Sequence, residues 1–530
     1  MKRLPARPDL GHLKKQAKDL LRRCREGDAE AAQRLGVPAP RLHDAQHCLA
    51  REHGFASWAD FQGFVLARRA LVDDPERATL QWLRLVYAGD IAGGNHRARP
   101  QLAERLCADG SVTLGDDPWL ACAVGDEARV RQAVAQDAGW VHRPGGPLRL
   151  PPLIAVTHSS LARLPAFADR LQACAALLLE AGADANQRVG NRWPPASLGA
   201  PDESQGLSAL YGAAGQNHHA GMARLLLGAG ADPNDGESLY HALGSLECTR
   251  LLLEAGARVP GTNALGRVLD MDDLPALRLL LAHGADANEP LPGGTTPLLW
   301  AIRRRRSLAH VQALVAAGAD LAAGTADGTA AHVQAQRYGL PEVAAFLREA
   351  VGAGDVSVGE RFVAACAQGD EAQARVLLAA QPGLVDALAP AQQWLLPELA
   401  AQPECAHAVR LMVRLGWPIE AHGGDWDGTA LHLAIFRGDA ALTRFLLEHG
   451  ADWRARHGFD DNACGALSWG SINTPEAGGD WAGCAQALLD HGLPSAAPDP
   501  QGSEAVVLDG RLMWFSDEVT DCLLENAGRP

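Results

Sequence analysis

The sequence lacks the features of a secreted disulfide protein and of a membrane protein. Its 11 cysteines are scattered from Cys24 to Cys522 without a C-x-x-C pair, which argues against a disulfide framework and a zinc ribbon. Apolar runs such as AALLLEAGA are shorter than the roughly 18 to 20 residues that a membrane-spanning helix needs. The N-terminal stretch MKRLPARPDLGHLKKQAKDL contains no apolar signal segment. We therefore expect reduced thiols and a cytoplasmic location.

Motifs of the common enzyme classes are also missing. No G-x-G-x-x-G, P-loop, G-x-S-x-G or H-E-x-x-H occurs where a strand leads into a helix. The net charge of -15 repels phosphate backbones and anionic membranes. The sequence therefore predicts no enzyme, no cofactor and no metal, and neither nucleic acid nor a membrane as partner.

Length and composition nevertheless predict a folded chain. With 530 residues the chain is too long for one compact core, so it must form several domains or an elongated array. Hydrophobic residues make up 47% and charged residues 21%, which is ordinary for a folded protein and leaves little room for long disorder.

A pair of short helices is predicted in DGTALHLAIFRGDAALTRFLLEHGAD, residues 427 to 452. Thr429 can cap the first helix, and Gly438 ends it. Gly450 supplies the left-handed residue that ends the second helix. Two such helices cannot bury their apolar stripes alone and need stacked neighbours, so the unit should repeat.

The sequence does repeat, with a period near 33 residues. The pattern L-L-x-x-G, or a close variant, closes at Gly182, Gly230, Gly284, Gly318, Gly450 and Gly492. The distance from Gly284 to Gly318 is 34 residues, as is that from Gly416 to Gly450. Together with GTALHLA (428 to 434) and GTTPLLWA (294 to 301), this period resembles the ankyrin repeat, whose consensus opens D-x-x-G-x-T-P-L-H-x-A and closes L-L-x-x-G-A-D.

The resemblance implies an all-α solenoid of stacked helix pairs with short hairpin fingers, preceded by a small helical capping domain. We expect about eleven to thirteen repeats of the bacterial type in a monomer. It also implies that His432 is structural, because the His of this motif bonds to the capping Thr429 and to nearby backbone. Ankyrin proteins bind partners through the finger tips and the adjoining concave helix faces.

Three segments are predicted along the chain. Residues 1–70 read as four helices of a leader that caps the apolar end of the stack. The first array spans 75–352 and the second 358–525, because ACAVGDEARVRQAVAQDAGWV is matched again by ACAQGDEAQARVLLAAQPGLV. The segment GAGDVSVG at 352 to 359 is short of large apolar residues and is the predicted joint.

The repeats are uneven in length. Gly230 to Gly256 spans 26 residues and Gly256 to Gly284 spans 28, so these repeats are expected to lack their projecting hairpins. Residues 184 to 206 are instead a long insertion, and insertions in solenoids map to loops that often bind.

Tryptophan points to a binding surface. The chain has 13 Trp beside 10 Phe and 4 Tyr. Trp300 is expected in the core, whereas three Trp fall in connecting segments, and Trp is enriched in binding hot spots. The predicted partner-binding residues are Asp425, Trp426, Asp427, Trp453, Arg454 and Trp193. The alternative is that these rings fold down onto the next repeat.

Other reactive residues have simple structural interpretations. His218 and His219 fit an exposed turn better than a metal site, because adjacent residues at a helix end point apart. Cys122 and Cys366 fit buried thiols rather than nucleophiles. The arginine run 303 to 306 is interpreted as a solvated turn, with an acidic partner as the alternative.

These observations lead to a noncatalytic scaffold that binds a protein or peptide. The alternative is an enzyme-associated role, either as a peptide-recognition subunit or as an immunity-type inhibitor of a separate enzyme. An intrinsic catalyst with a site not visible in the sequence comes third.

Overall fold

The chain consists of two compact units, Met1–Asp286 and Ala287–Pro530. The structure is a computed structural model that describes the chain except for residues 1, 3, 6, 39, 41, 75–76, 113, 474–477, 501–504 and 526–530. Residue 75, where the first array is predicted to begin, lies outside the described residues.

The leader folds into the four expected helices, which belong to the first unit. They are α1 (Leu10–Arg25), α2 (Ala29–Leu35), α3 (Leu42–Glu52) and α4 (Trp58–Asp73). Asp9 caps α1 by accepting a hydrogen bond from the His12 amide, and Ser57 caps α4 by accepting from the Asp60 amide. A small core cluster that includes Leu20, Leu35 and Leu49 holds α1, α2 and α3 together.

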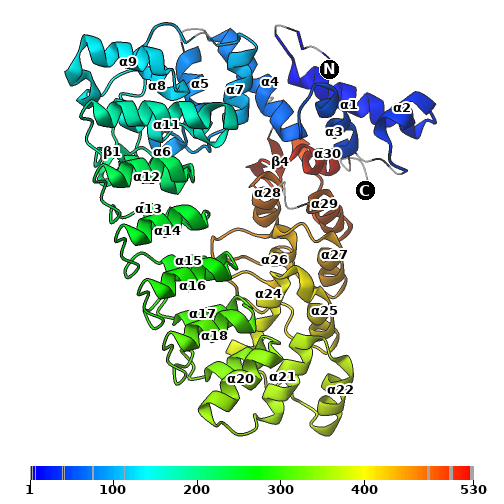
Figure 1. Cartoon of the computed structure of the whole chain (residues 1–530). Coiled ribbons are helices and arrows are strands. Elements are labelled where there is room, and N and C mark those ends of the chain that lie inside the picture. The colour runs from blue at the N-terminus through cyan, green and yellow to red at the C-terminus, as the bar shows by residue number, and fades with distance from the viewer. Residues whose placement is uncertain are drawn as a thin grey trace. The chain divides into compact units, whose positions relative to one another are not determined.

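The rest of the first unit is built almost entirely of helices (Figure 1). Its elements are α5 (Ala78–Val86), α6 (Gly89–Ala92), α7 (Pro100–Ala108), α8 (Pro118–Val124), α9 (Glu127–Gln136), η1 (Ala138–His142), α10 (Pro152–Thr157), η2 (Ser160–Arg163), α11 (Pro165–Glu180), β1 (Arg188–Asn191), β2 (Asp202–Ser208), the π-helix η3 (Tyr211–Gln216), α12 (Ala220–Gly228), α13 (Ser238–Ala242), α14 (Leu246–Glu254), α15 (Ala264–Asp270) and α16 (Leu274–Ala282).

The second unit continues the same alternation of short helices. Its elements are α17 (Pro297–Arg303), α18 (Leu308–Ala316), α19 (Ala331–Arg337), α20 (Pro341–Val351), α21 (Val358–Gln368), α22 (Glu371–Ala380), α23 (Pro390–Gln393), α24 (Leu395–Ala400), η4 (Pro403–Cys405), α25 (Ala406–Arg414), α26 (Ala430–Phe436), α27 (Ala440–Glu448), α28 (Ala463–Asn473), α29 (Trp481–Asp490), β3 (Ala497–Pro498), β4 (Val506–Leu508), β5 (Arg511–Met513) and α30 (Asp517–Glu525).

Stacked helix pairs form the body of each unit. Within the described residues there are eleven pairs, namely α8/α9, α10/α11, η3/α12, α13/α14, α15/α16, α17/α18, α19/α20, α21/α22, α24/α25, α26/α27 and α28/α29. In the second unit, the first helices α24, α26 and α28 contact one another in sequence, as do the second helices α25, α27 and α29. One continuous core, from Phe362 to Leu523, runs through these pairs. The predicted solenoid of helix pairs is therefore confirmed.

The closing glycines of the repeats adopt the backbone conformation that their position predicts. Gly230, Gly284, Gly318 and Gly450 have φ angles of +90°, +84°, +90° and +94°. In this left-handed region a side chain is strained, so glycine is the residue that ends the second helix of a pair most easily.

Two small sheets qualify the all-α expectation. Strands β1 and β2 pair antiparallel within the long insertion, and β3, β4 and β5 form a three-stranded sheet after α29. Among the described residues, three further connections hold a single bridge each, namely Gly145 with Leu150, Gly324 with Ala330 and Gly423 with Gly428. The fold is thus mostly helical, with strands confined to connections between helix pairs.

The predicted joint at 352–359 does not interrupt the stack. Helix α19, before this segment, packs against α21, which begins at its end. Arg337 of α19 donates to Glu360 of α21 over 2.6 Å, and both side chains are largely buried. The boundary between the compact units falls instead after Asp286.

A ladder of asparagines, not predicted from the sequence, joins successive repeats. Asn186 donates to the Gly230 carbonyl at 2.9 Å and accepts from the Asp232 amide at 2.7 Å. Asn234 and Asn288 make the same two bonds to the repeats that follow them. Each Asn stands four residues after a closing glycine, so one side chain satisfies two backbone groups of its neighbour.

Candidate functional site

His432 holds its repeat to the next finger. Its Nδ1 accepts a hydrogen bond from the Thr429 amide at 3.0 Å, and its Nε2 lies 3.0 Å from the Ala455 carbonyl oxygen. Because Nδ1 accepts, the ring proton sits on Nε2 and donates to Ala455. Burial, with a smaller contribution from nearby His457, lowers the pKa of His432 to about 4. The ring is fully buried, which fits a structural role rather than a role in proton transfer.

Gly438 and Gly450 end the two helices of this repeat. Their φ angles are +68° and +94°, as the motif predicts. An added Cβ on Gly438 would lie 2.7 Å from the Gly479 Cα, so the turn also needs glycine for close packing against the following repeat.

A continuous line of aromatic rings crosses the finger and the first helices of the last repeats. We call Phe459, His457, Trp426, Phe436 and Trp469 the aromatic track. Its successive ring centroids lie 6.0, 4.9, 5.6 and 5.0 Å apart. The two ends are open to solvent, with Phe459 77% and Trp469 51% exposed, while the middle rings are partly or fully buried. Exposed large rings on a packed support are typical of binding hot spots.

Trp426 and Trp453 differ in their surroundings, although both fall in predicted fingers. Trp426 is half-buried in the middle of the track. Trp453 is only 3% exposed and belongs to the core of the second unit, so the expectation that its ring projects outward is wrong. The guanidinium carbon of Arg454 lies 4.2 Å from the ring centre of Trp453.

The aspartates beside Trp426 have separate roles. The Asp425 carboxylate is held by Arg303 at 3.0 Å and Arg304 at 2.8 Å. Asp427 is exposed at the finger tip with a φ of +51°, and lies 3.6 Å from His422. Asp427 therefore faces solvent, whereas Asp425 serves the architecture of the repeat stack.

Trp193 lies in the first unit, on the hairpin of β1 and β2. Its ring is half-exposed and packs beside α6, where an added Cβ on Gly89 would come within 3.1 Å of it. It has no ring contact with another aromatic residue in the described part of the chain. Trp193 is therefore a second, smaller surface feature.

Four further aromatic side chains of the second unit are exposed, although their sequence positions did not predict it. They are Trp394, Phe459, Trp469 and Trp514. The Ser468 hydroxyl donates to the Trp514 carbonyl at 2.6 Å, which places the backbone of Trp514 beside the helix that carries Trp469. An aromatic residue in a helix gives no local sign of facing solvent, because its exposure depends on which neighbours pack on that face.

The arginine run is not a solvated turn. Arg303 and Arg304 pair with Glu398 and Asp425, and Arg305 approaches Glu404. Trp300, expected in the core, is instead half-buried beneath Arg303 and Arg304, whose guanidinium carbons lie 5.2 and 4.2 Å from its ring centre. The chain thus supplies its own acidic partners to this run.

The other cysteines and histidines singled out in the sequence are buried thiols and ring nitrogens bonded to backbone. Burial raises the pKa of Cys366 to about 12 and that of Cys122 well above its usual range, which disfavours a nucleophilic thiolate. His219 caps α12 by accepting from the Met222 amide, and His218 lies near the His241 carbonyl. Across the described residues, no group of three or more His, Cys, Asp or Glu side chains is placed to hold a metal ion.

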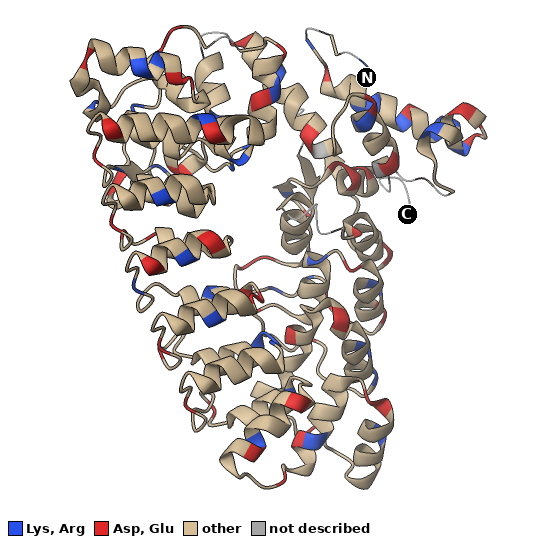
Figure 2. Ribbon diagram, in the orientation of Figure 1, with Lys and Arg blue, Asp and Glu red and all other residues tan. Residues whose placement is uncertain are grey.

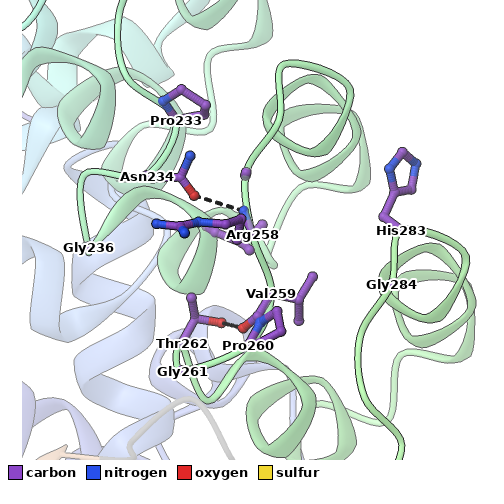
Figure 3. Close-up of a pocket in the computed structure, with 12 residues that line it drawn as sticks. Pro233, Asn234, Gly236, Arg258, Val259, Pro260, Gly261, Thr262, His283 and Gly284 are labelled. Atoms are coloured by element: carbon purple, nitrogen blue, oxygen red, sulfur yellow. Dashed lines mark hydrogen bonds between the residues drawn. The ribbon is translucent and has the colours of Figure 1, made fainter.

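A cavity of about 460 Å³ opens in the first unit where the repeats are shortest (Figure 3). Asn234 accepts from the Arg258 amide on one wall, while Pro260 occupies the next ladder position and has no amide side chain to offer. The break in the ladder explains the opening. Its walls are mainly turns, with Arg258 and His283 exposed, so it is a weaker candidate than the aromatic track.

The finger that carries Trp426 contacts the finger that carries Phe459 at Gly458. A substitution of Gly458 therefore tests whether this contact keeps the two fingers rigid. An added Cβ would lie 2.8 Å from the Trp426 carbonyl oxygen, and the Gly458 amide donates to that oxygen at 2.9 Å. We expect Gly458→Ala to part the fingers, lower the unfolding free energy by about 1 to 2 kcal/mol and speed amide exchange of both fingers. Gly354→Ala is the control, because nothing lies within 4 Å of its added Cβ. Unchanged exchange in Gly458→Ala would show that the contact is dispensable.

Comparison with known proteins identifies the family. Residues 427–458 match the family model of the ankyrin repeat. Cyclin-dependent kinase 4 inhibitor B of Homo sapiens is 36% identical over 128 residues, covering 23% of this chain and 93% of that protein. The Rattus norvegicus protein of the same name is 34% identical over 131 residues, covering 24% and 99%. The chain belongs to the ankyrin repeat family.

A solved structure with related repeats is the human ASB11 ankyrin repeat domain. It is 23% identical, covers 45% of this chain and 100% of its own, and superposes with a TM-score of 0.22. Family membership indicates a protein-binding role, since ankyrin repeats typically bind proteins and carry no catalytic site. In the described part of the chain, no helix combines the length and the apolar character needed to cross a bilayer.

Proposed function

We propose that this chain is a noncatalytic cytoplasmic scaffold that binds a protein or peptide partner through the aromatic track. The observation that carries the proposal is the contact of exposed Phe459 and Trp469 with a rigid, partly buried line of rings. Rings held by their neighbours lose little conformational entropy when a partner docks, which favours affinity. The chain acts in this proposal as a monomer without a cofactor.

The distribution of charge supports a protein partner over nucleic acid. Figure 2 shows acidic and basic residues interspersed along the helices of both units. Nucleic-acid binding draws mainly on a concentrated basic surface, and the net charge here is -15.

The partner itself is the second part of the proposal. The curated relatives are named as inhibitors of cyclin-dependent kinase 4, which favours an enzyme as the partner and inhibition as the effect. In that version the chain covers a surface of a separate enzyme. In the alternative version it presents a peptide to such an enzyme.

The experiment compares capture of a partner by the wild type and by variants of the track. We expect Trp469→Ala with Phe459→Ala to weaken binding by about 1 to 3 kcal/mol, or roughly 5- to 150-fold, because hot-spot rings carry much of the binding energy. The melting temperature should stay close to that of the wild type, since both rings lie at the surface. Dissociation constants from calorimetry with the purified partner provide the measurement.

Trp193→Ala is the matched control in the first unit. It removes another half-exposed indole and should leave the dissociation constant unchanged. If Trp193→Ala abolishes capture while the track variant binds normally, the insertion hairpin is the binding site and the track is not.

A further inference from the structure

Two arginines at the end of α17 form ion pairs with acidic residues that lie several repeats later in the sequence. Arg303 donates to Glu398 over 2.7 Å and lies 3.0 Å from Asp425. Arg304 donates to the other oxygen of the Asp425 carboxylate over 2.8 Å. We call Arg303, Arg304, Glu398 and Asp425 the arginine clasp.

The clasp breaks the usual rule of a solenoid, in which each repeat contacts only its neighbours. Arg303 and Glu398 are 95 residues apart, and Arg304 and Asp425 are 121 apart. The helix pairs α19/α20 and α21/α22 lie between them in the sequence. The ion pairs therefore close across the inside of the bend that these repeats form, and oppose its straightening.

The two ends of the clasp differ in their access to water. The Glu398 side chain is 11% exposed, so its pairing with Arg303 is poorly screened by salt. The Asp425 side chain is 47% exposed, which makes this end the more sensitive to ionic strength. Arg304 stacks on Trp300, which fixes the guanidinium that faces Asp425.

Asp425 connects the clasp to the aromatic track through the backbone. It immediately precedes Trp426, whose carbonyl accepts from the Gly458 amide at 2.9 Å, and Phe459 follows Gly458. A displacement of Asp425 therefore moves Trp426 and, through this hydrogen bond, the finger that carries Phe459.

We propose that the arginine clasp is a salt-sensitive conformational device in which Arg303 and Arg304 are positioning residues for the fingers that carry Trp426 and Phe459. With the clasp closed, the bend is fixed and the track is assembled. With it open, the fingers move independently. The consequence for partner binding rests on the function proposed above, whereas the clasp itself is a property of the free chain.

Hydrogen exchange of the full chain, read by mass spectrometry, tests the clasp without a partner. In Arg304→Ala, amides of 423–428 and 457–460 should exchange roughly three- to tenfold faster than in the wild type. Arg444→Ala is the matched control, because it removes an arginine that pairs with Asp490 at 2.9 Å on second helices of the stack. It should leave these two segments unchanged.

A salt series and a double variant separate a clasp from simple local loosening. Raising NaCl from about 0.05 to about 1 M should speed exchange of both segments in the wild type, and less so in Arg304→Ala, where Asp425 keeps only its pair with Arg303. Asp425→Asn removes the pairs with both arginines and should speed exchange at least as much as Arg304→Ala, and the double variant should behave like Asp425→Asn alone. Additive effects, or salt-independent exchange in the wild type, would overturn the proposal. Either result would leave binding by the track to be judged by its own variants.

Discussion

Deletion of residues 1–73 is expected to lower the free energy of unfolding of the first unit by several kcal/mol and to make the chain self-associate. The reason is that α4 packs directly against α5 and α7, the first helices after the leader (Figure 1). Leu102 of α7 lies against α4 beside Gly63, where an added Cβ would be 3.6 Å from the Leu102 side chain. Without the leader this face of the stack is bare.

Arg105 adds a second set of contacts that the deletion removes. It donates to the carbonyls of His53 and Gly54 over 2.7 and 2.8 Å, and its guanidinium lies 3.6 Å from the centre of the Phe55 ring. Burial of one large apolar side chain contributes about 1.5 to 3 kcal/mol, so losing the cover of Leu102 and the Arg105 contacts amounts to roughly 3 to 6 kcal/mol.

Thermal unfolding and light scattering after size exclusion measure both effects. Deletion of residues 1–8 is the control, because it keeps all four leader helices and the Asp9 cap. A chain without residues 1–73 that melts at the wild-type temperature and stays monomeric would show that the leader is not a cap.

The repeat architecture was predictable from the sequence because its signals are local. The closing glycines mark helix ends because this position needs a positive φ angle, which Gly230 and Gly450 adopt. The apolar stripe of α1, with Leu10, Leu13 and Leu20, is buried as its helical spacing predicts. Such features depend on residues a few positions apart, so a single sequence contains them.

The candidate site was only partly predictable, because exposure depends on distant packing. Trp453 and Phe459 lie six residues apart in one finger, yet the first is buried and the second is open to solvent. Nothing in the local composition distinguishes them. Trp469 was missed because its helix is apolar on most sides, and only the stack decides which side faces solvent.

Contacts across several repeats could not be predicted from the sequence, for the same reason. The run Arg303 to Arg306 looks like a solvated turn until the bend brings Glu398 and Asp425 to it. The Asn ladder is a repeating signal at a fixed distance from the closing glycines, so an alignment of the repeats with one another would have revealed it.

Acidification is expected to loosen the repeat around His432, with a loss of about 3 kcal/mol between pH 6.5 and pH 4. Burial lowers the pKa of this ring from the ordinary 6.5 to about 4 in the folded chain. Between pH 6.5 and pH 4, the unfolded chain therefore binds a proton on the His432 ring, whereas the folded chain keeps this ring neutral. Stability is complete above pH 6.5 and falls as the pH drops toward 4, at about 1.4 kcal/mol per unit.

The chemical reason lies in the hydrogen bonds of the ring. Nδ1 accepts from the Thr429 amide, and a protonated Nδ1 has no lone pair to accept with. The charge also arises in the core beside His457, far from water. His158 in the first unit is a parallel case, since burial lowers its pKa to about 3.

Amide exchange of α26 and of residues 455 to 457, corrected for its intrinsic pH dependence, is the appropriate measurement because a solenoid unfolds locally. In the wild type, local opening should become more frequent by about two orders of magnitude from pH 6.5 to pH 4. His432→Gln should open more readily at pH 7, by about 1 kcal/mol, but lose this pH dependence, because the amide does not titrate. His449→Gln, at the end of α27, serves as the control and should keep the wild-type profile. If His432→Gln retains the full acid sensitivity, another group is responsible, and the buried neutral imidazole is not what holds this repeat together.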